Sequence, residues 1–139
     1  MITLVPLCTM TLRVAPPLDI GATPTGQRMI AEISSGELAG RVTGTLAGTS
    51  SADWFTRASD GLGLPDVRIA ISTHDHALIL MRYHGRIRLV PNQEATALMA
   101  PTFETSDPRY RWINDIQAAG KGTFSADRTR LDYELYELQ

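Results

Sequence analysis

The amino-acid sequence predicts a mainly β protein, folded as an antiparallel barrel or sandwich. Apolar and polar residues alternate with a period of two along most of the chain, and the 3.6-residue period of helices is rare. Turn signals recur about every 8–12 residues and separate about eight to ten short strands. Glycines also fall inside strand-like segments, where they indicate the bends that a closing barrel requires.

Size and composition exclude several classes of protein. The chain has 139 residues, which predicts a single β-barrel domain spanning residues 1–139. Its net charge is −2 and no basic face is evident, so a nucleic-acid partner is not expected. The apolar runs are too short to cross a bilayer, and the N-terminus lacks the pattern of a secretory signal. Cys8 is the only cysteine, so we expect no internal disulfide and a cytoplasmic location.

The individual elements follow from local patterns. Alternation predicts strands over 8–14, 27–33, 38–46, 67–83 and 129–138, with Ser34–Gly36 as a turn or bulge between the second and the third. Residues 103–105 and 110–114 are expected to be extended. Glu94–Ala100 is the best candidate for a short helix, because it is rich in helix-forming residues and ends before Pro101. We expect at most one or two short helices in total.

Residues 67–83 form the clearest predicted hairpin. A turn centred on His74-Asp75 places Val67, Ile69, Ile71, Leu78 and Leu80 on one apolar face. The other face is mixed and has the character of a wall that faces a ligand. It carries Arg68, Ala70, Ser72, Ala77, Ile79, Met81 and Tyr83.

The segment Gly48–Trp54 is predicted to be a loop that places an acid beside a large aromatic ring. Small and polar residues precede Asp53, and Trp54 is one of only two tryptophans. Partial burial beside the ring would raise the pKa of Asp53 and let it exchange protons near neutrality. The alternative is structural, with Asp53 capping a turn and Trp54 filling the mouth of a barrel.

Further candidate site residues are an arginine and an aromatic cluster. Arg68 lies between apolar neighbours and could bind a carbonyl or enolate oxygen, although an outward-facing arginine is the commoner arrangement. Tyr110, Trp112 and Asn114 would share one face of a strand, either around a ligand or as an aromatic core stripe.

The sequence His74-Asp75-His76 raises the possibility of a metal site. Two histidines at positions i and i+2 can share a strand face, and His84 could supply a third ligand. The predicted turn makes neighbouring side chains diverge, however, and the set of ligands is incomplete. We therefore expect no metal and no other cofactor.

Taken in order, these segments resemble a family known as domain of unknown function 3237. The resemblance runs from Leu7 to Leu138 and rests on an ordered set of short motifs: Gly26-Gln-Arg28, Gly36-x-x-x-Gly40, Gly44, Ala52-Asp53-Trp54, Asp60-Gly61, Asp66-Val-Arg68, Thr73-x-Asp75, Gly85, Phe103-Glu-Thr105, Tyr110-x-Trp112-x-Asn114 and Tyr133-Glu-Leu-Tyr136. It implies an antiparallel β-barrel of the calycin or allene-oxide-cyclase kind that is often oligomeric, with a dimer as the favoured state. His76 and Ser51 replace glycines that are usual in the family, and both changes lie near the presumed mouth of the barrel.

These observations favour a cofactor-independent enzyme, an isomerase, cyclase or lyase, acting by acid/base chemistry on a small apolar or aromatic molecule that contains oxygen. The predicted catalytic residues are Asp53, Arg68 and Tyr110. The predicted substrate contacts are Trp54, Tyr83, Trp112, Asn114, His76 and Glu104. The alternatives are a non-catalytic barrel that binds a small molecule, and a structural or partner-binding module whose barrel is filled by side chains.

Overall fold

A computed structural model describes residues 1–139 and shows twelve strands and one short 3₁₀ helix, η1. The strands are β1 (Leu4–Val14), β2 (Leu18–Thr23), β3 (Gly26–Gly40), β4 (Gly44–Leu46), β5 (Ala52–Arg57), β6 (Leu62–Leu64), β7 (Asp66–Thr73), β8 (Leu78–Arg88), β9 (Ala95–Met99), β10 (Thr102–Glu104), β11 (Ala118–Phe124) and β12 (Arg130–Leu138), and η1 spans Pro108–Asp115. No helix is long and apolar enough to cross a membrane.

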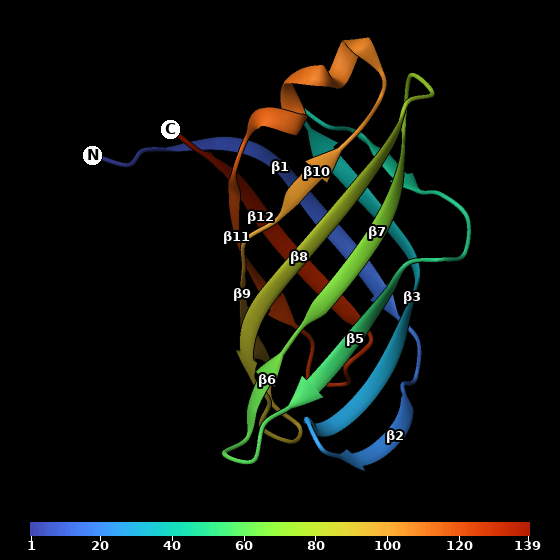
Figure 1. Ribbon diagram of the computed structural model, residues 1–139, viewed down its shortest axis with the longest axis vertical. Helices are drawn as coiled ribbons and strands as arrows, with labels where there is room; N and C mark the ends of the chain where they lie inside the picture. Colours follow the sequence, from blue (N-terminus) through green and yellow to red (C-terminus); the bar gives the residue numbers. More distant parts are fainter.

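The sheet closes on itself into an antiparallel barrel (Figure 1), which confirms the barrel alternative of the predicted fold class. Backbone pairing runs from β1 through β3, β5, β7, β8, β9, β11 and β12 and returns to β1. The short strands β2, β4, β6 and β10 extend this circuit. Closure leaves few free edges, and edges are what make open sheets prone to aggregation.

The strand β3 turns a corner of the barrel as the sequence predicts. Its first half pairs with β5 and its second half with β1. The pairing with β1 shifts between Arg13 and Val14, which lie opposite Ser35 and Ile33, so that Ser34 is an extra residue. Ser34–Gly36 is therefore a bulge, one of the two predicted alternatives, and a bulge of this kind increases the local bend.

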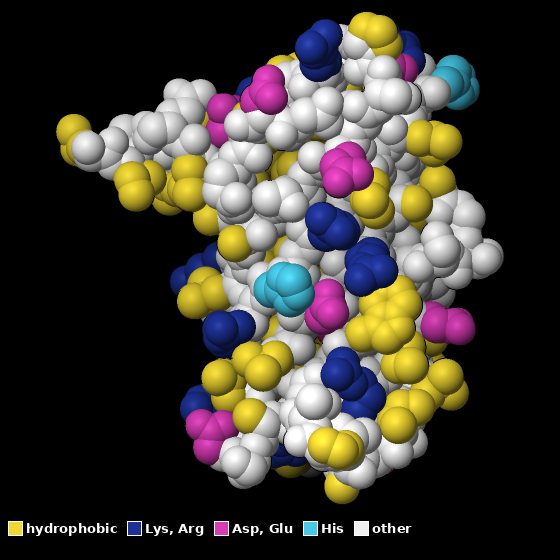
Figure 2. Space-filling model, viewed as in Figure 1, with side chains coloured by type: hydrophobic (Ala, Val, Ile, Leu, Met, Phe, Trp, Pro, Cys, Tyr) yellow, Lys and Arg dark blue, Asp and Glu magenta, His cyan; other side chains and the backbone are white.

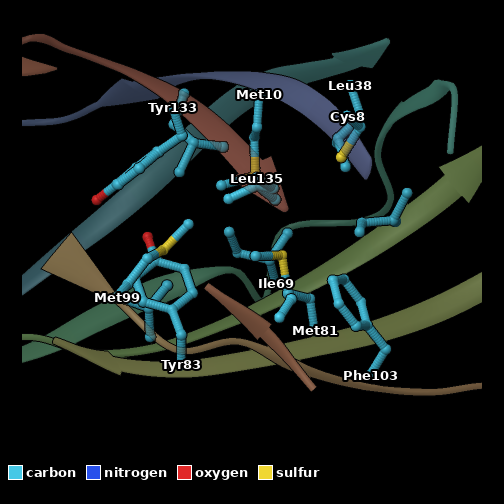
Figure 3. Close-up of a cluster of buried hydrophobic side chains, with 14 of the residues drawn as sticks. Cys8, Met10, Leu38, Ile69, Met81, Tyr83, Met99, Phe103, Tyr133 and Leu135 are labelled. Atoms are coloured by element: carbon cyan, nitrogen blue, oxygen red, sulfur yellow. The ribbon is translucent and has the colours of Figure 1, made fainter. Parts of the chain in front are cut away.

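The interior of the barrel is a single apolar core (Figure 3). Leu12, Ile69, Ile71 and Met81 are fully inaccessible to solvent, and each comes from the inward face of an alternating strand. Fully burying a side chain of this size stabilises the fold by about 1.5–3 kcal/mol.

The hairpin of β7 and β8 is confirmed, but its predicted register is wrong by one residue. Val67 pairs with Tyr83 and Ile71 with Ile79, so the turn holds three residues rather than two. The turn closes through Thr73 and Ala77, whose backbone groups bond at 2.9 Å, and His76 adopts a φ of 70°. Compared with a two-residue turn, a three-residue turn moves every side chain of the second strand to the opposite face of the sheet. Leu78 and Leu80 consequently point outward, whereas Ile79, Met81 and Tyr83 join the core.

Two local predictions are corrected. Residues 94–100 do not form a helix, because 95–99 are strand β9, hydrogen-bonded between β8 and β11. Ladder bonds on both sides and the inward alternation of Ala95, Ala97 and Met99 override the helix propensity of the segment. Residues 110–114 are not extended but belong to η1, which Asp107 caps by accepting a 2.9 Å bond from the Arg109 amide.

Candidate functional site

A cavity of about 270 Å³ opens at the end of the barrel near β2 and β6, opposite the end that carries η1. Fourteen of its 18 lining residues are hydrophobic, so a charge inside it is poorly solvated. The four polar exceptions are Asp53 on β5, Tyr83 on β8, Tyr133 on β12 and Arg128 at the rim. The lining includes no Ser, Thr, Cys, Lys or His, so its only side chains that could act as nucleophiles are the carboxyl group of Asp53 and the two phenols.

Asp53 is the one acid of this cavity. Its Oδ1 accepts a 3.0 Å hydrogen bond from the backbone N–H of Asp66, and its Oδ2 makes no hydrogen bond. Burial raises the pKa of Asp53 to about 6; the bond from Asp66 lowers it only in part. The carboxyl group can therefore be either protonated or ionised near neutral pH. The predicted loop is corrected, because Asp53 lies on strand β5, and the apolar cavity rather than the Trp54 ring surrounds it.

Asp53, Val67 and Tyr83 lie on one rung across three neighbouring strands. Asp53 pairs with Val67 and Val67 pairs with Tyr83. Strands lie about 4.8 Å apart, so Asp53 and Tyr83 stand roughly 10 Å apart at their Cα atoms. Both residues line the cavity. The charge of Asp53 is near enough to contribute to the raised pKa of Tyr83, whose main cause is burial.

Tyr83 and Tyr133 form an edge-to-face pair. Their ring centroids are 6.0 Å apart at an interplanar angle of 67°, and the side chains are almost fully buried. Figure 3 shows both hydroxyl oxygens on the same side of the core, away from Phe103 and Cys8. The Tyr83 hydroxyl is buried and has no hydrogen-bond partner at bonding distance, although the nearby Tyr133 phenol contributes to its raised pKa. Burial raises the pKa of Tyr133 to about 12.

Glycine in β11 makes room for the second ring. Gly122 pairs with Tyr133, and a Cβ atom at position 122 would collide with the Cδ1 and Cε1 atoms of that ring. Tyr133 is a site residue that the sequence analysis did not select. The available signal was its place on the apolar face of the last strand, opposite a glycine.

Arg128 is the other missed residue, and it fastens the loops at the rim. It has a φ of 62°, and its guanidinium donates hydrogen bonds to the carbonyl oxygens of Val90, Gln93 and Ser125 at 2.8, 2.8 and 3.2 Å. The same group lies 5.3 Å from the centroid of the Phe124 ring. Because its guanidinium binds three backbone carbonyl oxygens, Arg128 has a structural role in holding the rim loops together.

Arg68 and Trp54 lie outside the barrel, which corrects their predicted place beside the pocket. Arg68 is exposed, and its guanidinium stands 5.6 Å from the centre of the Trp54 ring. Strand alternation explains this, because Arg68 lies between the inward-facing Val67 and Ile69, and Trp54 lies between Asp53 and Phe55, which line the cavity. Figure 2 shows the basic side chains of this outer face beside acidic, histidine and apolar groups.

The aromatic cluster on η1 lies at the other end of the barrel and does not share one face. Tyr110 donates a 2.8 Å hydrogen bond to Asp75 at the hairpin tip, and Trp112 stacks under Arg41 at 4.6 Å. Asn114 exchanges two hydrogen bonds with the backbone of Thr105. These three side chains fasten η1 to the barrel, and none of them reaches the cavity.

His76 and Glu104 are exposed residues outside the cavity. His76 belongs to the hairpin turn, and Glu104 borders a shallow outer hollow beside Leu78 and Leu80. No group of three or more His, Cys, Asp and Glu side chains is arranged so that it could hold a metal ion. Of the predicted site residues, the structure thus brings only Asp53 and Tyr83 together.

The raised pKa of Asp53 gives a testable pH dependence of stability. The acid is harder to ionise when folded than when unfolded, so its contribution is most favourable below its ordinary pKa of 3.8 and is lost as pH rises through about 6. Asp53→Asn should therefore stabilise the protein more at pH 8 than at pH 4. The difference in the free energy of unfolding between variant and wild type should be larger at pH 8 by up to about 3 kcal/mol. Urea unfolding at both pH values measures this. An unchanged difference between the two proteins would contradict it.

A small closed antiparallel β-barrel with one apolar, acid-bearing cavity is the class that this fold and site define. The chain belongs to the family described as "Protein of unknown function (DUF3237)", whose profile matches residues 2–138. A relative from Bradyrhizobium diazoefficiens, called UPF0311 protein blr7842, is 28% identical over 138 residues, covering 89% of this chain and 90% of that protein.

Solved structures share the whole fold. A "beta-barrel like protein" from Acinetobacter baumannii is 27% identical with a TM-score of 0.89, covering 100% of this chain and 97% of the other. A protein of unknown function from Rhodopseudomonas palustris is 21% identical with a TM-score of 0.88, covering 100% and 99%. An enzyme from Penicillium herquei is 23% identical with a TM-score of 0.75, covering 100% and 94%.

Proposed function

We propose that the protein is a cofactor-independent enzyme, an isomerase, cyclase or lyase, that transfers protons on a small apolar or aromatic molecule held in the barrel. The observation that carries the proposal is Asp53, a carboxyl group with a pKa of about 6 inside an apolar cavity. General acid/base catalysis is most efficient when the pKa of the group lies near the working pH.

The geometry of Asp53 fits this role. One carboxyl oxygen is held by the Asp66 amide, while the other has no partner and is free to meet a ligand. A cavity of about 270 Å³ supports a bound molecule rather than a barrel filled by side chains. The neighbour from Penicillium herquei, described as an enzyme, is compatible with catalysis on this fold, although its identity of 23% extends only to the fold.

The proposal changes the assignment of roles that the sequence favoured. Asp53 keeps its place as the acid/base. Arg68 and Tyr110 have no part in it, because the cation is outside the barrel and the phenol is bonded to Asp75 at the far end.

The deciding experiment identifies the ligand and follows its protons. Molecules that co-purify with the folded protein are identified by mass spectrometry and returned to ligand-free protein in D₂O. The proposal would be supported by incorporation of deuterium, or by formation of an isomer, a cyclised product or an elimination product, provided that the change observed is lost in Asp53→Asn. Tight binding of a molecule that returns unchanged and unlabelled would instead establish a non-catalytic binding protein.

A direct titration tests the property on which the proposal rests. The carboxyl ¹³C resonance of Asp53, assigned by its loss in Asp53→Asn, should titrate with a midpoint about two pH units above that of an ordinary aspartate. A midpoint near 4 would leave Asp53 permanently ionised at neutral pH and remove its suitability as a general acid.

A further inference from the structure

The Tyr83 hydroxyl is a donor that lacks an acceptor. Nearly every buried hydroxyl in a folded protein has a hydrogen-bond partner, because leaving one unpaired costs free energy. Tyr83 is only 3% exposed, its oxygen is unpartnered, and it lines the cavity on the same rung as Asp53. An unpaired donor in a cavity large enough for a ligand indicates where an oxygen atom of that ligand belongs.

We propose that Tyr83 binds the oxygen of a neutral carbonyl compound, so that the substrate is an apolar ketone or a related molecule with an enolisable C–H group. The assignment of the reaction rests on the proposed function of Asp53, whereas the binding of the oxygen does not.

The charges of the cavity select a neutral ligand. Asp53 would repel a carboxylate or phosphate, and the only cation of the lining, Arg128, has its guanidinium bonded to three backbone carbonyls at the rim. Tyr83 remains a protonated donor at neutral pH because burial raises its pKa well above the ordinary value. Tyr133 packs edge-on against it and fixes the direction of the ring.

The two polar groups then divide one reaction between them. The Asp53 carboxylate removes a proton from the carbon next to the carbonyl: the C–H bond breaks, an O–H bond forms on Asp53, and the electron pair moves onto the carbonyl oxygen. Tyr83 stabilises that enolate oxygen with its O–H group. Return of the proton from Asp53 to a conjugated carbon completes an isomerisation with no other reactant. Hydrogen exchange results when the Asp53 O–H proton is replaced by one from solvent before a proton returns to the same carbon. An aspartate base paired with a tyrosine donor is an established combination for such chemistry.

The test uses 2-tetralone, a neutral two-ring ketone. Two analogues are compared with it: tetralin, the hydrocarbon that lacks the oxygen, and tetralin-2-carboxylate, which carries a negative charge. We expect 2-tetralone to bind about tenfold more tightly than tetralin, as one additional hydrogen bond provides, and the carboxylate to bind more weakly than the ketone. The carbonyl infrared band of bound 2-tetralone should move to lower wavenumber than in an apolar solvent. Tyr83→Phe should abolish both the shift and the tenfold preference.

Tyr136→Phe is the matched control, since this phenol bonds to Glu134 and does not line the cavity. It should leave both readouts at their wild-type values. Tyr83→Phe should also raise the melting temperature of the ligand-free protein, because it removes an unpaired buried hydroxyl. A hydroxyl with a structural role would show the opposite sign.

Exchange of the α-hydrogens of 2-tetralone in D₂O separates the inference from the proposed function. An infrared shift that depends on Tyr83, without exchange that depends on Asp53, would uphold the oxygen site and refute the catalytic role of Asp53. Failure of 2-tetralone to bind, binding no tighter than that of tetralin, or a shift that survives in Tyr83→Phe would each overturn the oxygen site, whatever Asp53 does.

Discussion

Asp53→Asn should lower turnover of the protein's substrate by at least about 10²-fold, which is the typical loss when a general acid or base is removed. Asparagine preserves the shape of the side chain and can still accept the hydrogen bond from Asp66, but it cannot exchange a proton. Substrate affinity should change much less than turnover. Steady-state kinetics with the ligand identified by co-purification measures both quantities.

Two control variants make this result specific. Asp115→Asn changes an exposed aspartate that lies outside the cavity, and Arg68→Lys changes the cation outside the barrel. Both should retain near-normal turnover. Folded Asp53→Asn protein with near-normal turnover would place proton transfer on another group, and a large loss in Arg68→Lys would show that the outer face takes part in the reaction.

The second large effect concerns stability. Ile69→Ala should lower the free energy of unfolding by about 2–5 kcal/mol, because Ile69 is fully inaccessible to solvent in the core and its truncation leaves a void. Leu78→Ala, on the paired strand, should change the free energy of unfolding by less than about 0.5 kcal/mol, since Leu78 is 66% exposed. Urea denaturation of both variants gives the comparison.

This pair of variants also tests the corrected register of the hairpin. The two-residue turn that the sequence favoured would bury Leu78 on the same face as Ile69, and both substitutions would then be costly. With the three-residue turn, only Ile69→Ala is costly. Equal destabilisation by the two variants would contradict the register seen in the structure.

The sequence alone determined the class of the fold and its main candidate residue. The period of two and the spaced turn signals are sufficient for strands, because alternating side chains face opposite sides of a sheet. The small-residue segment before Asp53 singled out the acid that lines the cavity, but Asp53 lies on strand β5 rather than in a loop, and the Trp54 ring lies outside the barrel. The sequence pattern also predicted Tyr83 on the ligand-facing wall, together with Arg68, which lies outside the barrel.

Only the tertiary structure decided which residues meet. Residues 95–99 have the composition of a helix, yet neighbours on both sides hold them as β9, and the small inward side chain of Ala97 leaves space for the cavity. Tyr133 enters the site from the last strand of the chain because closure of the barrel brings β12 and β11 round to β9.

This division between what the sequence determined and what the tertiary structure decided has a physical cause. A strand pattern records which side chains share a face, but pairing across strands depends on the parity of the turn and on how the sheet closes. One additional residue in the turn at His74–His76 moved Leu78 and Leu80 to the outside and set Tyr83 in line with Asp53 through Val67. Local sequence therefore determined the strands and the acid, whereas long-range pairing determined the cavity around them.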